Sequence, residues 1–186
     1  IHSFDFLNFS NKLGGKIGIN LSKESIFNWY KINKNKINFP WAEDLTSRRF
    51  INLVYNYEYI NSSSKLEDKK KLDLIILNHM YRVIFEFNLK KIGELTSYDL
   101  LAYLLSILIL KRINIKEINY LKFIIDNQID KIGMHKSYNI LEHAKYINNL
   151  NELKSICLYF KINLPTNLNE IINKMTSTLN EYFHLD

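Results

Sequence analysis

The chain has few of the residues that cross-link or interrupt a polypeptide. Its 186 residues include one Cys, two Pro and five Gly. A single cysteine excludes an intramolecular disulfide, and we expect Cys157, which lies in an apolar stretch, to be a small buried side chain. So few prolines and glycines disfavour a β-sandwich with many turns and favour long helices joined by short loops.

The sequence also lacks an apolar run that could cross a membrane. Its most apolar segment, residues 100–110, is shorter than the roughly 20 residues that a spanning helix requires and contains Tyr103 and Ser106. This segment predicts a fully buried helix. No signal peptide is visible, and because the chain starts at Ile1 we expect it to be a segment of a longer protein.

Patterns typical of metal, nucleotide or nucleophile sites are missing as well. The histidines and the cysteine do not have the spacing of zinc ligands, and no Gly-rich phosphate loop occurs. We therefore expect no cofactor in this segment. His79 and His143 fall within predicted helices and are expected to be structural.

What the chain does have is helical periodicity along almost its whole length. Hydrophobic residues make up 47% of it, enough for a folded domain with a substantial core. The apolar spacing predicts helices over residues 4–13, 22–33, 44–61, 66–88, 97–111, 115–129, 137–148, 151–161 and 166–183. Short connections favour antiparallel neighbours, so the predicted fold is all-α: antiparallel helical hairpins in a single domain over residues 1–186.

Several predicted helices begin with recognisable caps. Thr96, followed three residues later by Asp99, approximates a capping box. Asn151 is a candidate cap for the helix over 151–161, and Pro165-Thr166 is a stop-and-cap signal before the last helix.

The formal net charge of +6 suits an anionic partner such as nucleic acid, an acidic polysaccharide or an anionic membrane. The lysines are spread along the chain, and the triplet Lys69-Lys70-Lys71 follows two acids at a helix start, which favours a solvated surface. No helix shows a clustered basic stripe with base-reading residues. A nucleic-acid-binding module therefore ranks last among the interpretations, and no nucleic acid is expected as partner.

The most distinctive segment is 39–52, where a Pro-Trp turn opens a helix that carries Arg48, Arg49 and Asn52. A planar guanidinium can bind a sugar carboxylate or sulfate through two hydrogen bonds. The flat ring of Trp41 suits a pyranose ring. These residues are therefore candidates for substrate binding.

A structural interpretation of the same segment stays open. In that interpretation Trp41 packs on the entry of the helix, and one of the two arginines pairs with Glu43 or Asp44.

A second candidate segment, residues 131–139, predicts a loop entering a helix and contains His135, Tyr138 and Asn139. His and Tyr are natural proton-transfer groups, and Asn can stabilise a developing oxyanion. The alternative is that His135 is a plain surface or capping residue.

Together these segments resemble the heparinase II/III-like polysaccharide lyases, in particular their N-terminal α/α-toroid domain. The family's Trp followed by Asp/Thr-x-Arg-Arg-x-x-Asn is matched by Trp41, Asp44, Thr46, Arg48, Arg49 and Asn52. Residues 133–139 look like a degenerate copy of its Gly-His turn, and residues from 150 to the end are similar to its last toroid helices.

The resemblance implies an incomplete α/α toroid followed by a β-sandwich domain of the same chain. It implies β-elimination on an acidic, uronate-containing polysaccharide, in a periplasmic or cell-envelope setting. His135 and Tyr138 would then be catalytic. The substrate-binding residues would be Trp41, Arg48, Arg49, Asn52 and Asn139.

One departure from the family supports another function. Characterised lyases carry a Gly-Asn-His element before a buried apolar helix, whereas Gly93-Glu94-Leu95 stands at that place here. Glu142 stands near the position of the family's catalytic tyrosine. Tyr138 could take the place of that tyrosine only if the loop were aligned with the family in a shifted register. The alternative is therefore a non-catalytic helical domain that binds or helps process an anionic surface glycan.

Overall fold

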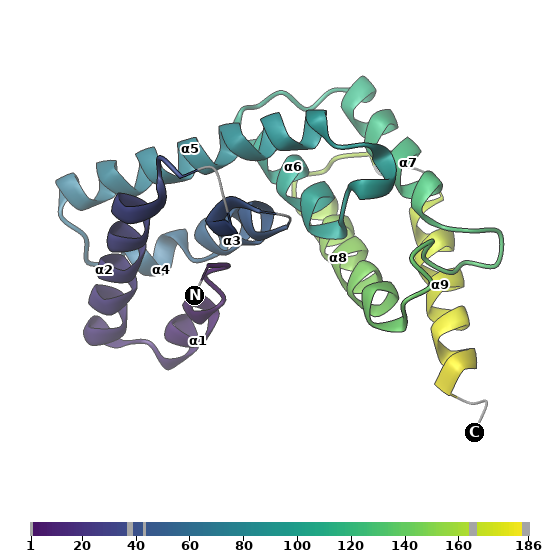
Figure 1. The fold of residues 1–186 in the computed structure, drawn as a ribbon, viewed down its shortest axis with the longest axis horizontal. Helices are drawn as coiled ribbons and strands as arrows, with labels where there is room; N and C mark the ends of the chain where they lie inside the picture. The colour runs from purple at the N-terminus through teal and green to yellow at the C-terminus, as the bar shows by residue number, and fades with distance from the viewer. Residues whose placement is uncertain (1, 37–38, 43, 164–166, 184–186) are drawn as a thin grey trace. The chain divides into compact units, whose positions relative to one another are not determined.

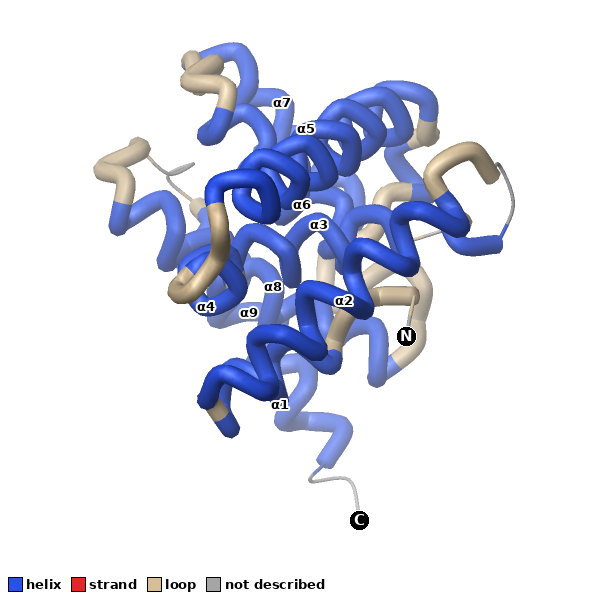
Figure 2. Tube along the Cα trace, turned by 90° about the vertical axis from the view of Figure 1, so that its left-hand side faces the viewer, coloured by secondary structure: helices blue, strands red, loops and turns tan. Residues whose placement is uncertain are grey.

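The computed structural model describes the chain except residues 1, 37–38, 43, 164–166 and 184–186. The described residues form helices and loops without a β-strand (Figure 2). One isolated antiparallel bridge joins Ile129 and His135. The predicted all-α class is thus confirmed. The chain divides into two compact units, Ile1–Asn88 and Leu89–Asp186, which are described separately.

Unit 1 is built from the helices of the first half of the chain. They are α1 (Phe6–Leu13), α2 (Gly15–Asn33), the 3-10 helix η1 (Phe39–Trp41), α3 (Leu45–Tyr55), α4 (Tyr57–Asn61) and α5 (Leu66–Leu89), which ends one residue beyond the unit (Figure 1). α2 packs against α1 and α4, and α3 packs against α1 and η1.

Two predicted boundaries in unit 1 were wrong. α2 begins at Gly15 rather than at residue 22, because Gly14 and Gly15 take positive φ angles of 68° and 83° and complete the turn from α1 on their own. The helix predicted over 44–61 is interrupted at Asn56, whose side chain bonds to Asn8 and to the backbone of Asn52.

Unit 2 contains the 3-10 helix η2 (Ile92–Glu94), α6 (Ser97–Ile109), α7 (Ile115–Gln128), α8 (Ile140–Tyr159) and α9 (Leu168–Phe183). α8 packs against α6 and α9, and η2 packs against α7. The separate helices predicted over 137–148 and 151–161 are one helix, since no Gly or Pro breaks the segment between them. Asn151 is therefore no cap: its amide donates to the Ile147 carbonyl, one turn back, at 3.1 Å.

Each unit has its own apolar core. In unit 1 the fully buried side chains include Phe50, Leu53, Ile60, Leu72 and Met80. In unit 2 every residue from Asp99 to Ile107 is buried, which confirms the predicted buried helix up to its last turn.

Other local predictions are confirmed in unit 2. Thr96 and Asp99 form a capping box at the start of α6, and Cys157 is a free, buried thiol. Burial raises the pKa of Cys157 to about 11. Among the described residues, none of the helices combines the length and apolar character needed to cross a membrane.

Candidate functional site

The predicted site residues lie in both units. Trp41, Arg48, Arg49 and Asn52 belong to unit 1, and His135, Tyr138 and Asn139 belong to unit 2. The two groups are considered one after the other.

Arg49 lies in the core of unit 1, inside a cluster of aromatic rings. Its side chain is fully buried, and its guanidinium carbon lies 4.0 Å from the ring centroid of Trp29 and 4.7 Å from that of Trp41. Phe4 adds a third ring at 5.7 Å. No carboxylate of the described residues forms an ion pair with it. The aromatic faces and the nearby charge of Glu86 therefore both favour the charged guanidinium.

Hydrogen bonds complete the surroundings of Arg49. Nε donates to Nε2 of His79 at 2.8 Å, and Nη1 donates to the backbone carbonyl of His2. Nη2 has no hydrogen-bond partner among the described residues. Burial lowers the pKa of Arg49 to about 9, which still leaves the group charged at neutral pH.

Trp41 is 5% exposed. The substrate-binding role that the resemblance implies would require an exposed face of its ring. Its indole Nε1 donates to the Asn33 carbonyl at 2.7 Å, and the guanidinium of Arg82 lies 4.2 Å from its ring centroid. Stacking of a sugar on Trp41 would require displacement of these neighbours.

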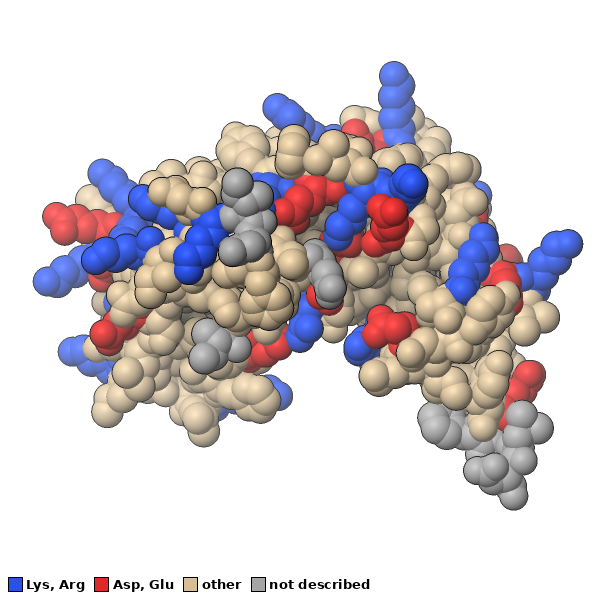
Figure 3. Space-filling view, in the orientation of Figure 1, with Lys and Arg blue, Asp and Glu red and all other residues tan. Residues whose placement is uncertain are grey.

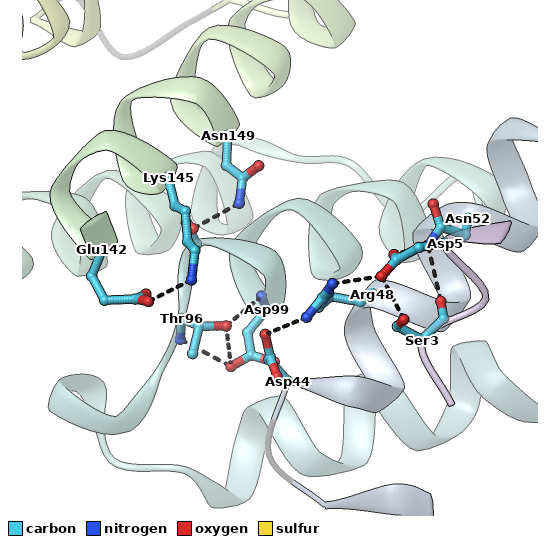
Figure 4. Close-up of polar contacts among 11 residues, drawn as sticks. Ser3, Asp5, Asp44, Arg48, Asn52, Thr96, Asp99, Glu142, Lys145 and Asn149 are labelled. Atoms are coloured by element: carbon cyan, nitrogen blue, oxygen red, sulfur yellow. Dashed lines mark hydrogen bonds and ion pairs between the residues drawn. The ribbon is translucent and has the colours of Figure 1, made fainter. Parts of the chain in front are cut away.

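Arg48, the residue before Arg49 in α3, is half-buried. Its Nη2 lies 2.7 Å from the Asp5 carboxylate, and its Nη1 lies 4.0 Å from Asp44 (Figure 4). The structural interpretation in which one arginine pairs with Asp44 is thereby confirmed. Glu43, the other acid considered for that role, lies outside the described residues.

Asn52 belongs to a chain of amide hydrogen bonds between α1 and α3, which we call the asparagine ladder and which consists of Asn8, Asn11, Asn52 and Asn56. The Asn52 amide donates to the Ser3 carbonyl and to Asp5 Oδ1, both at 2.9 Å (Figure 4). Its own oxygen accepts from Asn8 at 3.0 Å. All three hydrogen bonds connect Asn52 to the N-terminal segment of the chain.

His135 is half-buried in unit 2 and is held between two polar side chains. The Ser137 backbone N–H points at Nδ1 over 3.2 Å, and the Ser137 hydroxyl lies 2.8 Å from the same atom. The Gln128 amide nitrogen donates to backbone carbonyls, so Gln128 Oε1 faces His135 Nε2 at 3.1 Å as an acceptor. These contacts assign the ring proton to Nε2, and burial lowers the pKa of His135, which favours the neutral imidazole.

Tyr138 and Asn139 do not join His135 in a shared site. Tyr138 is 67% exposed and has a positive φ of 52°. Asn139 is the N-cap of α8: its Oδ1 accepts from the backbone N–H groups of Leu141 at 2.9 Å and Glu142 at 3.2 Å. Because this oxygen already accepts two hydrogen bonds from the first turn of α8, its role in the structure is that of a helix cap.

The tyrosine that does contact His135 is Tyr146, which the sequence interpretation missed. Its ring centroid lies 4.8 Å from that of His135, and its hydroxyl is buried without a hydrogen-bond partner among the described residues. Burial raises the pKa of Tyr146. The signal was present in the sequence, because a helix capped at Asn139 places His143, Tyr146 and Leu150 on one buried face.

His79 and His143 are buried and bonded to backbone groups, as expected for structural residues. His143 receives the His135 backbone N–H at Nδ1 over 3.1 Å, while its Nε2 lies 2.8 Å from the Met175 carbonyl. In the part of the chain that the structure describes, no group of three or more His, Cys, Asp and Glu side chains could hold a metal ion.

Comparison of the chain with models of protein families, with curated proteins and with solved structures finds no match. The resemblance to the heparinase II/III-like lyases therefore stays a prediction that rests on the residues quoted for it.

Proposed function

We propose that this chain is a non-catalytic helical module that binds an anionic glycan, an acidic polysaccharide in particular. Unit 2 supports this choice over a catalytic cleft, because Tyr138 is exposed and Asn139 caps α8, so neither joins His135 in a shared site.

The predicted binding residues of unit 1 are occupied as well. Trp41 and Arg49 are packed in the core, Arg48 is paired with Asp5, and Asn52 belongs to the asparagine ladder. Binding of an anionic polymer therefore falls to other cationic groups.

The observation that carries the proposal is a group of exposed lysines where α2 and α5 meet. Lys71 Nζ lies 4.1 Å from the ring centroid of Phe27. Lys31 and Lys34 follow Phe27 by four and seven residues, so they share its side of α2. We call these three residues, Lys31, Lys34 and Lys71, the lysine face.

The lysine face carries three positive charges, and its neighbouring acid on α5, Glu67, lies one turn before Lys71. All three side chains are exposed, and no carboxylate among the described residues forms an ion pair with them. Figure 3 shows basic side chains over α2 and the beginning of α5, with acidic side chains among them. Like charges on one face raise the local concentration of a polyanion, which suits a polymer with regularly spaced carboxylates or sulfates.

Binding of heparin and polygalacturonate, measured by isothermal titration at low salt, tests the proposal. Substitution of all three lysines of the lysine face by Gln lowers the net charge from +6 to +3. We expect this triple variant to bind the polysaccharides about tenfold more weakly or worse. The matched control exchanges Lys111, Lys116 and Lys136 in unit 2, which are also exposed, for Gln with the same loss of charge.

Equal weakening in the two triple variants would contradict a localised site and indicate a general charge effect. Stronger binding of single-stranded nucleic acid than of either polysaccharide would contradict the choice of partner.

A catalytic form of the proposal, a heparinase II/III-like lyase in an incomplete α/α toroid, is favoured by one observation. His135 carries a neutral imidazole whose Nδ1 lone pair could take a proton if Ser137 released it. The test is the ultraviolet absorbance of unsaturated uronate with a panel of acidic polysaccharides. If product forms and is lost in His135→Ala, the lyase function would be favoured over the non-catalytic binding module. If no product forms while polysaccharide binding is retained, the lyase function would be excluded for the chain tested.

A further inference from the structure

Four large apolar side chains are exposed where α1 turns into α2. Leu13 is 87% exposed, Ile17 78%, Phe9 69% and Leu21 59%. They follow one another at intervals of four residues, two on each helix. We call Phe9, Leu13, Ile17 and Leu21 the apolar tip. Exposed apolar residues grouped in this way mark an interaction surface rather than a solvated one.

The backbone at the turn is open to its surroundings. A Cβ atom added to Gly14 or Gly15 would meet no other atom within 4 Å. Three residues after Gly15, a Cβ at Gly18 would lie 2.7 Å from the Tyr59 hydroxyl, so the side of α2 that meets α4 is the one with Gly18. Ile17 and Leu21 are therefore not needed to pack α2 against the rest of unit 1.

The charged side chains of residues 6–23 have one sign. Residues 6–23 contain Lys12, Lys16 and Lys23 and no Asp or Glu. Lys12 and Lys16 are exposed and directly precede Leu13 and Ile17. The first acid after this segment, Glu24, is exposed and lies seven residues after Ile17, on the same side of α2. The acid-free apolar surface thus ends at Glu24.

We propose that the apolar tip inserts into the interfacial region of an anionic lipid bilayer. Apolar side chains enter the boundary between headgroups and acyl chains, while Lys12 and Lys16 stay with the anionic headgroups. A second copy of the chain is a poorer occupant, because a symmetric contact through this tip would bring the lysines of both copies together. This surface is independent of the lysine face and of the proposed glycan.

Flotation of the chain with vesicles tests the proposal. The probe is a vesicle of phosphatidylcholine with about 30% phosphatidylserine, compared with phosphatidylcholine alone. We expect binding to the anionic vesicle, and the pair Leu13→Ser and Ile17→Ser should weaken it about tenfold or more. Lys12→Gln with Lys16→Gln should also weaken it and remove most of its dependence on salt.

The control pair is Leu66→Ser with Ile115→Ser, which removes side chains that are 67% and 77% exposed elsewhere. Both pairs should keep the circular dichroism of the unchanged chain, because all four side chains project into solvent. Equal loss of vesicle binding in the two pairs, or equal binding to neutral vesicles, would contradict the proposal. If sedimentation showed a dimer that dissociates in the Leu13→Ser, Ile17→Ser variant, the apolar tip would be a contact between two copies of the chain instead of a membrane contact.

Discussion

Arg49 donates its Nε–H to Nε2 of His79 over 2.8 Å, and both side chains are fully buried. Because Nε2 accepts this bond, the ring proton must lie on Nδ1, where it faces the Ile75 carbonyl at 2.8 Å. A neutral imidazole thus occupies the place that a carboxylate would usually take beside a buried arginine. Burial, followed by the nearby charge of Arg49, lowers the pKa of His79 to about 3.

This arrangement predicts a loss of stability in mild acid. The pKa of His79 is about 6.5 in the unfolded chain and about 3 in the folded one, so between these values only the unfolded chain binds the proton. The free energy of unfolding should therefore be insensitive to His79 above pH 6.5. As the pH falls from 6.5 toward 3, it should decrease by about 1.4 kcal/mol per pH unit from this residue.

Urea unfolding at pH 7 and pH 4.5, followed by tryptophan fluorescence, measures this dependence. The chain has two tryptophans, Trp29 and Trp41, and both lie beside Arg49, so the signal reports on unit 1. His79→Gln should be less stable at pH 7 but should lose less stability on acidification. An unchanged pH dependence in this variant would show that other groups cause the acid sensitivity.

A second prediction separates the two neighbouring arginines. Arg49→Ala removes a fully buried side chain from its aromatic surroundings and should lower the free energy of unfolding by about 3 kcal/mol or more. Arg48→Ala breaks a partly exposed ion pair with Asp5 and should cost about 1 kcal/mol or less. The same fluorescence measurement compares them, and similar losses in both variants would contradict a core role for Arg49.

A third variant tests whether Arg49 acts through its charge or its volume. Arg49→Met keeps much of the volume but leaves the acceptors on His79 and His2 without their donor. We expect a loss between those of the Ala variants at positions 48 and 49, on the order of 2 kcal/mol. Stability equal to that of the unchanged chain would assign the role of Arg49 to packing alone.

Apolar periodicity predicted the helical class because each helix presents a core face that the sequence displays directly. It located the buried helix that begins after Thr96, since both the apolar run and the capping box are local signals. It could not locate the break at Asn56, because that break depends on a hydrogen bond to Asn8, 48 residues earlier. Local sequence patterns do not identify hydrogen-bond partners so far away in the chain.

The candidate site illustrates the same limit. Trp, Arg and Asn in close succession are residue types that bind sugars, but the same types pack a polar helix interface. The sequence does not reveal that Arg49 is surrounded by Phe4 and Trp29, which precede it by 45 and 20 residues. The choice between a binding and a structural role therefore depends on tertiary packing.

A further prediction concerns the asparagine ladder. Asn52→Ala removes a donor to Ser3 and Asp5 and an acceptor for Asn8, and it should lower the free energy of unfolding by about 2 kcal/mol. Asn20→Ala, at an exposed position of α2, should change it by about 0.5 kcal/mol or less. A double-mutant cycle between Asn52 and Asn8 measures their coupling, and additive effects would show that their bond contributes no coupling energy.

The last prediction distinguishes a helix cap from a substrate ligand at Asn139. Loss of the Asn139 oxygen in Asn139→Ala leaves the first N–H groups of α8 without their acceptor and should cost about 1 kcal/mol. Amide hydrogen exchange at Leu141 and Glu142 should become faster, whereas Asn139→Asp, which keeps an acceptor oxygen, should largely restore protection.

Asn114 caps α7 with the same geometry, accepting from Lys116 and Glu117, so Asn114→Ala is the matched control for stability. Polysaccharide affinity should be the same in both Ala variants, because a cap acts on its own helix and not on a ligand. If Asn139→Ala weakened that affinity about tenfold while Asn114→Ala did not, the Asn139 side chain would have to contact the glycan as well as the helix, and the cap alone would not explain its role.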